Sequence, residues 1–357
     1  MKYLIAVSSL TQGSGLSRYV LSLCNLLANS NKVSVVTTHD NVDCTYERAE
    51  LDKISLDIKL ISLGHKSKLG KYFGAMKAVR DEAPDVVINN YNGVFQYILP
   101  LINHKIRIVH ILHNDTDDFY RIGSINGGKV DGWIAPTMAI AEHFNQYTHN
   151  RYADKVRVIA HGVEEARFSE RKNERLEIVY AGVLYEHKGV KILPDIISRL
   201  IKANIDIHFT IIGNGLLDDW LKEQFDKEIE NGIVTMTGVI PHDEVYRLMS
   251  KADIFLYPTH LDAFGLVIAE AMMNGAIPVV THLPGITDNL ITDGKEGFLI
   301  AQDNVESFVE TIIKLKNECE FRHILSEASH KKALKCFSID VMKDAYLKYL
   351  LNDIVVK

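Results

Sequence analysis

This chain of 357 residues has few cysteines, no long apolar run and no excess of positive charge. Its four cysteines stand far apart without the spacing of a metal site, which favours free thiols in a reducing compartment. No run of about 18 apolar residues occurs, so we expect no membrane-spanning helix. The net charge of −6 argues against general nucleic-acid binding. Together these absences predict a soluble, cytoplasmic protein.

Segments of strand and helix type alternate along the chain, which predicts parallel sheets covered on both faces. The length suits two domains. In the first half we expect strands at Lys2–Ser8, Lys32–Thr38, Val86–Asn89, Arg107–Leu112, Gly132–Pro136 and Val156–Ile159, and helices at Leu16–Ala28, Lys71–Arg80 and Met138–Gln146. In the second half we expect strands at Ile178–Ala181, His208–Ile212, Ile233–Thr237, Ile254–Tyr257 and Ile277–Thr281, and helices at Val190–Lys202, Leu217–Glu230, His242–Lys251 and beyond Ser307.

The segment Asp253–Val280 combines a short apolar strand, a loop and a predicted helix at Leu266–Met273. The first N–H groups of a helix and its dipole both favour negative charge. Phe264, Gly265 and Leu266 are therefore expected to supply backbone donors to a phosphate, and the glycine lets a ligand come close to the backbone.

Two acids, Asp262 and Glu270, remain in this apolar segment, eight positions apart. If a diphosphate lay at the helix start, Glu270 could accept the hydroxyls of an attached ribose. Asp262 would then lie on the other side of the phosphates, near a transferred sugar. This arrangement fits a clamp for a nucleotide sugar. The alternative is an ordinary strand–helix unit with two surface acids.

The neighbouring residues make the segment resemble the signature of the family 4 glycosyltransferases. Pro258-Thr259 stands for its Pro-Ser, and Asp262 and Glu270 stand for its two glutamates at the same spacing. Ala271-Met272 and Gly275-Ala-Ile-Pro278-Val279 complete the pattern. The first acid departs from the family because it is aspartate, whose side chain has a shorter reach.

This resemblance implies the α/β fold called GT-B, with two doubly wound Rossmann-like domains facing across a cleft. The stretch from His161 to Glu164, with Phe168, resembles the family's linker between domains. We therefore expect an acceptor-side domain at residues 1–168 and a donor-binding domain at 169–338. The resemblance also implies that a C-terminal helix, at residues 339–357, packs back onto the first domain.

A glycine loop with Gly13 and Gly15 follows the first predicted strand. A dinucleotide-binding fingerprint fails here, because Arg18 occupies the position of the third glycine. The loop instead resembles the family's glycine loop, which approaches the donor phosphate and the acceptor. A simple turn is the alternative.

His113 stands just past a predicted strand, at a position where the resemblance places a histidine that lines the sugar site. It could hydrogen-bond a hydroxyl of the donor or help to stabilise a developing oxocarbenium ion. His110 lies inside the strand pattern and is interpreted as a packed histidine. The acidic triplet Asp115-Thr-Asp117 could hold a divalent ion, but the resemblance argues against a metal, and we expect no cofactor.

Lys188, followed by Gly189, resembles the family's lysine that neutralises the leaving diphosphate. The family's partner arginine is absent, because Val183 occupies its place. Another cation could substitute, the enzyme could be slow, or the pocket could differ. Taken without the resemblance, Lys188 would be an ordinary surface lysine.

Two further turns resemble parts of the family's nucleotide site. Gly213 and Asn214 belong to a Gly-x-Gly turn that borders the nucleotide. Ile240 lies in a loop whose backbone edges pair with the base. Backbone pairing leaves the identity of the base unreadable from side chains.

The stretch Lys66–Arg80 is basic and of helical type. A solvated helix face is the ordinary interpretation. The alternative is a peripheral docking face for anionic lipid or an anionic acceptor.

We therefore predict a retaining glycosyltransferase that moves a sugar from a nucleotide diphosphate sugar, with UDP favoured, to an acceptor hydroxyl. Its catalytic residues would be His113, Lys188 and Asp262. The acceptor would be a saccharide, free, lipid-linked or protein-linked, in bacterial cell-surface polysaccharide or glycoconjugate synthesis. Two alternatives stay open: a non-hydrolysing sugar-nucleotide epimerase, and a catalytically weak nucleotide-sugar-binding subunit.

Overall fold

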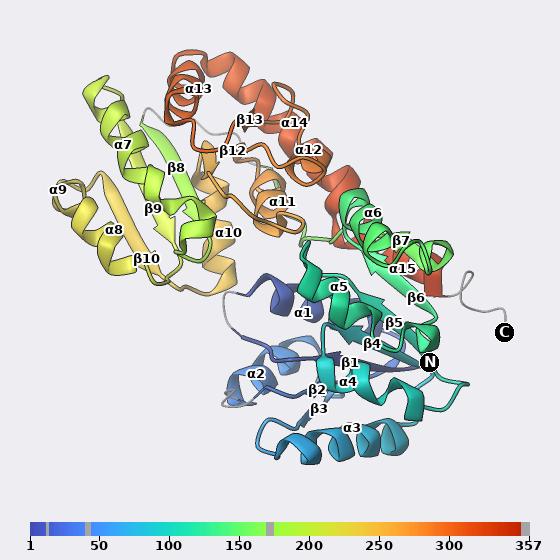
Figure 1. Cartoon of the computed structure of the whole chain (residues 1–357). Helices are drawn as coiled ribbons and strands as arrows, with labels where there is room; N and C mark the ends of the chain where they lie inside the picture. The colour runs from blue at the N-terminus through green and yellow to red at the C-terminus, as the bar shows by residue number, and fades with distance from the viewer. Residues whose placement is uncertain (12–13, 40–43, 169–174, 351–357) are drawn as a thin grey trace. The chain divides into compact units, whose positions relative to one another are not determined.

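The computed structural model describes residues 1–11, 14–39, 44–168 and 175–350. It divides the chain into two compact units (Figure 1). The first unit comprises Met1–Gly162 together with the chain from Met342, and the second comprises Val163–Val341. Among the described residues, no helix is long and apolar enough to cross a membrane.

The first unit contains a seven-stranded parallel sheet. Its strands are β1 (Lys2–Val7), β2 (Lys32–Thr37), β3 (Lys59–Ser62), β4 (Val86–Asn90), β5 (Arg107–Ile111), β6 (Gly132–Ala135) and β7 (Val156–Val158). The order across the sheet is β3-β2-β1-β4-β5-β6-β7. The helices are α1 (Gly15–Ala28), α2 (Cys44–Ile54), α3 (Lys68–Glu82), α4 (Gly93–Ile98), α5 (Asp117–Ser124) and α6 (Met138–Tyr147).

The core of this unit includes residues from both ends of the chain. The inner strands are buried along almost their whole length, as expected for parallel strands with both faces covered. Helix α15 (Ile339–Lys348) contributes Met342 and Tyr346 to the same apolar cluster. The hydroxyl of Tyr346 is hydrogen-bonded to that of Tyr19 on α1. The C-terminal helix is thus part of the first unit's core.

The second unit contains a six-stranded parallel sheet. Its strands are β8 (Leu176–Ala181), β9 (Ile207–Ile212), β10 (Val234–Gly238), β11 (Ile254–Tyr257), β12 (Ile277–Thr281) and β13 (Phe298–Ile300), in the order β10-β9-β8-β11-β12-β13. The helices are α7 (Leu193–Lys202), α8 (Asp218–Gln224), α9 (Asp226–Glu230), α10 (His242–Lys251), α11 (Leu266–Met273), α12 (Thr287–Leu290), α13 (Val305–Asn317) and α14 (Cys319–Phe337).

Helix α11 is buried because α14 covers it. Ser326 Oγ donates to the carbonyl of Gly275 over 2.6 Å, and His330 Nδ1 lies 2.6 Å from the carbonyl oxygen of Met273. These contacts satisfy carbonyls at the end of α11 that have no partner within the helix. The position of α11 is therefore fixed at its C-terminus, while its amino end remains at the edge of the sheet.

The structure contains elements that the residue pattern did not predict. The first unit adds α2, β3, α4 and α5, and the second adds α12 and β13. The single helix expected at Leu217–Glu230 is two helices, α8 and α9, separated at Phe225. Phe225 is buried, and its ring packs edge-on against Phe209 of β9, with 6.2 Å between the ring centroids.

Candidate active site

Loops from the carboxyl ends of β8 and β11 meet in the second unit, at the point where the strand order reverses. In open α/β sheets, ligands bind at such a switch point. The N–H of His260 donates to the carbonyl of His187 over 2.9 Å, and Thr259 Oγ1 donates to the same carbonyl over 3.3 Å. The two loops are therefore held together as one surface.

Glycines allow these loops to come so close. Gly189 has φ +66, and a Cβ there would lie 1.7 Å from the carbonyl oxygen of Pro258. Gly213 has φ +126, and a Cβ there would lie 2.0 Å from the carbonyl oxygen of Gly182. The carbonyl of Asn214 accepts the N–H of Leu184 over 2.9 Å. Gly213 and Asn214 thus join the β9 loop to the β8 loop.

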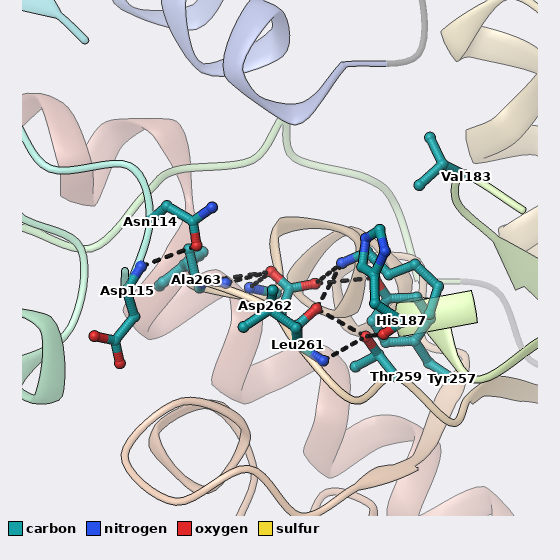
Figure 2. Close-up of polar contacts among 12 residues, drawn as sticks. Asn114, Asp115, Val183, His187, Tyr257, Thr259, Leu261, Asp262 and Ala263 are labelled. Atoms are coloured by element: carbon teal, nitrogen blue, oxygen red, sulfur yellow. Dashed lines mark hydrogen bonds and ion pairs between the residues drawn. The ribbon is translucent and has the colours of Figure 1, made fainter. Parts of the chain in front are cut away.

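One oxygen of Asp262 organises the start of α11. Its Oδ1 accepts hydrogen bonds from the backbone N–H groups of Ala263, Phe264 and Gly265, over 2.8, 3.4 and 2.9 Å. Figure 2 shows these bonds converging on the carboxylate. The side chain therefore fixes the turn that leads into the helix.

The other oxygen of Asp262 faces a cation. Its Oδ2 accepts from Lys188 Nζ over 3.0 Å and from the Tyr257 hydroxyl over 2.9 Å (Figure 2). Burial acts to raise the pKa of Asp262, but the charge of Lys188 and the hydrogen bonds outweigh it and keep that pKa below its ordinary value. Asp262 is thus an anion at neutral pH.

Lys188 is enclosed by the same loops. Its Nζ also donates to the carbonyl of Leu261 over 2.8 Å and lies 5.5 Å from the ring centroid of Tyr257. Val183, in the place of the family's arginine, has its carbonyl bonded to the Tyr180 hydroxyl over 3.0 Å. In Figure 2 the side chain of Val183 stands apart from the Asp262 cluster. Lys188 is therefore the cation that these loops direct at Asp262.

The amino end of α11 retains open backbone donors. Gly265 caps the helix with φ +82, a conformation that glycine adopts without strain. Phe264 and Gly265 direct their N–H groups at Asp262, whereas those of Leu266 and Val267 reach no acceptor among the described residues. Binding of a phosphate by Phe264, Gly265 and Leu266 stays a prediction, and Leu266 has its donor available in this structure.

Glu270 lies one turn into α11 and is almost completely buried. Its Oε1 is 2.8 Å from Nε2 of His242, the first residue of α10. The ring of His242 is in turn 4.5 Å from that of Tyr246. Glu270 is therefore held in a fixed orientation by the first residue of α10, which follows the loop that contains Ile240. The pattern predicted His242 at the start of a helix but gave no sign of the pairing, which links residues 28 positions apart.

His113 belongs to the first unit. Its Nε2 is 3.0 Å from Asn90 Oδ1, and its ring packs edge-on against Tyr19, with centroids 4.9 Å apart. Burial lowers the pKa of His113 well below its ordinary value, and the neighbouring His161 and His110 add to the effect. His113 is therefore neutral at pH 7. With Nε2 as the donor to Asn90, its Nδ1 is left as an acceptor.

The glycine loop is described only in part. Gly13 lies outside the described residues. Gly15 begins α1 behind the cap residue Ser14, and a Cβ built on Gly15 meets no atom within 4 Å. The fold itself therefore does not require glycine at position 15, so a ligand that comes close to the backbone would give a reason for it.

The remaining polar candidates have structural partners. His110 is buried and lies 3.0 Å from Gln96 Oε1, as expected for a packed histidine. Asp115 accepts from the Tyr120 hydroxyl over 2.5 Å, and both of its oxygens are 2.9 Å from His143 Nδ1. Among the residues that the structure describes, no group of three or more His, Cys, Asp or Glu side chains could hold a metal ion.

Two family models match the chain. The model of the glycosyl transferases group 1 matches residues 162–332, and the model of glycosyltransferase family 4 matches residues 13–167. The chain belongs to the family 4 glycosyltransferases. It is an enzyme that transfers glycosyl groups, as the signature around Asp262 and Glu270 predicts.

Curated relatives of this family 4 glycosyltransferase match parts of their own length. An uncharacterised glycosyltransferase of Methanocaldococcus jannaschii is 24% identical over 290 residues, which are 76% of this chain and 75% of that protein. Sulfoquinovosyl transferase of Arabidopsis thaliana is 28% identical over 171 residues, 47% of this chain and 32% of the plant protein. The match to the plant protein thus spans about a third of its length.

The fold of the glycosyltransferase is that of known GT-B structures. The crystal structure of HepE from Anabaena in complex with UDP and glucose has a TM-score of 0.81, with 98% of this chain and 99% of that chain covered. Its sequence identity is 16%, so the likeness concerns the fold. The predicted architecture of two parallel-sheet α/β domains is confirmed.

Proposed function

We propose that this glycosyltransferase is a retaining enzyme that moves a sugar from a UDP-sugar to a hydroxyl of an acceptor. The observation that carries the proposal is the ionised Asp262, held by Lys188 beside the amino end of α11 at the switch point of the second sheet. The UDP in the HepE complex supports uridine as the base.

The donor would bind mainly to the second unit. Its pyrophosphate would accept hydrogen bonds from the amino end of α11, where the N–H of Leu266 is open. Glu270, oriented by His242, would accept the ribose hydroxyls. Lys188 would offset the negative charge that grows on the departing diphosphate.

Asp262 is poorly suited to be a covalent nucleophile. It already accepts five hydrogen bonds and faces an ammonium group. Both features stabilise the carboxylate and lower its nucleophilicity. We therefore favour same-face transfer, in which the bond from the anomeric carbon to the phosphate oxygen breaks as the bond to the acceptor oxygen forms. The acceptor's proton then passes to a phosphate oxygen of the departing UDP.

His113 would contribute as a neutral group. An imidazole without charge does not repel a developing oxocarbenium ion, and its Nδ1 can accept a hydrogen bond from a sugar hydroxyl. This role rests on the family resemblance and on the surroundings of His113 within the first unit. We propose a saccharide acceptor, free or attached to lipid or protein, in cytoplasmic synthesis of cell-surface polysaccharides or glycoconjugates, without a metal cofactor.

One observation favours a second candidate, a subunit that binds a nucleotide sugar but transfers it weakly. Val183 supplies no charge to a diphosphate, and in Figure 2 its side chain stands apart from Asp262. Such a subunit would bind the donor as the transferase does but would release little UDP when acceptor is present.

The first experiment measures thermal stability with UDP, UDP-glucose, UDP-N-acetylglucosamine and GDP-mannose. A ligand at 100 times its dissociation constant should stabilise the protein by about 2.7 kcal/mol. We expect a UDP-sugar to stabilise it more than GDP-mannose does. Stabilisation by none of the four would remove the support for donor binding.

The second experiment measures UDP release with saccharide and glycolipid acceptors, and the anomeric configuration of the product by NMR. A retaining transferase releases UDP in proportion to product and keeps the α or β configuration of the donor, whereas an inverted product would contradict the retaining mechanism. Release that needs no acceptor would indicate a hydrolase, whereas conversion of the donor to its epimer without net release of UDP would indicate the non-hydrolysing epimerase. Donor binding without release would indicate the weak subunit.

A further inference from the structure

Helix α3 presents large apolar side chains to solvent. Leu69 and Phe73 are each 70% exposed and Met76 is 37% exposed. Their spacing of four and three positions puts them on one side of the helix. They form what we name the α3 stripe: Leu69, Phe73 and Met76.

The opposite side of α3 carries small residues and faces the sheet. Ala75 and Ala78 are buried. A Cβ on Gly74 would lie 2.8 Å from Leu63 Cδ2, so the glycine lets the helix pack closely. An ordinary surface helix buries its large apolar residues and exposes polar ones. In α3 the small residues pack against the core, whereas the large apolar residues of the α3 stripe do not.

Basic residues flank the stripe. Lys66, Lys68, Lys77 and Arg80 are all exposed. Of the nearby acids that the structure describes, Asp81 pairs with Arg80 over 3.1 Å, and Glu82 is buried and pairs with Lys59, so neither acid pairs with the three lysines. This concentration of positive charge stands in a chain whose net charge is −6.

Helix α4 lies beside α3 (Figure 1). Tyr97 of α4 is 53% exposed, and its ring meets that of Tyr72 edge-on with 6.4 Å between centroids. Tyrosine is an amphipathic residue that favours the boundary between apolar and aqueous layers. The exposed apolar surface thus involves two helices of the first unit.

We propose that the α3 stripe and its basic flank dock the first unit on a lipid surface that contains anionic headgroups. Apolar side chains enter the boundary of the acyl chains while lysines and arginine bind the headgroups, which is how interfacial helices attach. The positive charge of the flank attracts anionic lipid headgroups. It does not attract a lipid surface that has no net charge. This proposal does not depend on the donor site, since α3 lies outside the second unit.

The test is co-sedimentation of the full chain with phosphatidylcholine vesicles that contain or lack phosphatidylglycerol. We expect binding only to the anionic vesicles. Binding should weaken as the ionic strength rises from about 0.1 M to about 1 M, because the screening length shortens from about 10 Å to about 3 Å. Equal binding to both kinds of vesicle, or binding to neither, would overturn the proposal.

Variants separate the two components of the surface. Leu69→Ser with Phe73→Ser removes the apolar contact and should lower the partition coefficient by at least about tenfold. Lys68→Glu with Lys77→Glu should lower it by at least about 25-fold, because each basic residue near the surface contributes about fivefold. Matched controls in the second unit are Ile324→Ser, at a site 57% exposed, and Lys227→Glu, and these should bind as the unchanged chain does.

Two measurements distinguish lipid binding from unfolding and from self-association. Every variant should keep the thermal transition of the unchanged chain, since the replaced side chains are exposed. Sedimentation velocity without vesicles should give one sedimentation coefficient for all of them. If the serine variant instead converts an oligomer to a monomer and still binds vesicles, the stripe is a contact between copies and the lipid proposal is wrong.

Discussion

Asp262 connects two loops through one carboxylate. Oδ1 accepts from the turn that leads into α11, and Oδ2 accepts from Lys188 and Tyr257. Both members of the ion pair are mostly buried, with side chains 15% and 16% exposed. Removing one charge from such a pair leaves the other charge mostly buried without an opposite charge beside it, which destabilises the folded state.

Replacing Asp262 with asparagine should therefore weaken both the fold and the reaction. We expect the free energy of unfolding, measured by urea titration, to fall by about 3 kcal/mol. UDP release in the presence of acceptor should fall at least about 100-fold. The control Asp195→Asn removes an exposed partner of Arg199 and should change stability by less than about 1 kcal/mol. Equal effects of the two substitutions would contradict this role of Asp262.

His110 and His113 should make stability depend on pH. Burial lowers the pKa of His110 from 6.5 to about 3. Between these pH values the unfolded state binds a proton at His110 that the folded state does not bind. The histidine's favourable contribution is complete above pH 6.5 and is lost as the pH falls from there toward 3. Between these values each such group contributes a slope of up to about 1.4 kcal/mol per pH unit. His110→Gln should reduce the slope of the unfolding free energy against pH, measured by urea unfolding between pH 6 and pH 4.5. The expected reduction corresponds to about one proton. An unchanged slope would contradict this effect of His110.

The residue pattern singled out Asp262 and Glu270 but not the residues that pair with them. Asp262 and Glu270 stand out because acids are rare in an apolar strand–helix segment. The partner of each could not be predicted, since Lys188 is 74 positions from Asp262 and His242 is 28 positions from Glu270. Only the fold brings these residues together. The hydrogen bonds from the Phe264 and Gly265 N–H groups to Asp262 likewise depend on the conformation of the loop.

At the level of elements, the site depends on loops that touch through glycines. Gly189 and Gly232 both have φ near +65, but a Cβ on Gly189 would meet the Pro258 backbone and one on Gly232 meets nothing within 4 Å. Alanine has the same conformational cost at both positions, because their φ angles are nearly equal. Only at position 189 does its Cβ also clash with the Pro258 backbone. The pair therefore separates backbone strain from close approach.

Gly232→Ala should lower the free energy of unfolding by about 1 kcal/mol and leave donor binding unchanged. Gly189→Ala should lower it by at least about 2 kcal/mol and weaken binding of a UDP-sugar, because the β8 and β11 loops must separate. Urea titration and the thermal shift with donor measure the two effects. If both variants bind donor equally well, contact between these loops is not needed for the site.

Most strands were predictable from their apolar runs, whereas β3, β13 and helix α2 were not. Ile254–Tyr257 and Ile277–Thr281 coincide with β11 and β12. The three residues of β13, Phe298–Ile300, are too few to show a period. Helix α2 uses the buried Glu47 at a core position, where it accepts the N–H of Leu10 over 3.0 Å. A carboxylate in the core breaks the apolar pattern on which the prediction depends.

At the scale of the whole molecule, the end of the chain contributes to the core of the first unit. Tyr346 lies in the same apolar cluster as Tyr19, and both are buried. Tyr346→Ala should lower the stability of this unit by about 3 to 5 kcal/mol. Hydrogen exchange should then rise in α1 and β1 and stay unchanged in β8 and β9. Val341→Ala, at a site 39% exposed on the same helix, is the control; faster exchange in the second unit alone would contradict this role of α15.

The measurement that tests the central claim most directly is a crystal structure of the enzyme soaked with its UDP-sugar. We predict a pyrophosphate within hydrogen-bonding distance of the Leu266 N–H at the amino end of α11, and a ribose hydroxyl on Glu270. An amino end of α11 without phosphate, with the nucleotide bound elsewhere, would contradict the account.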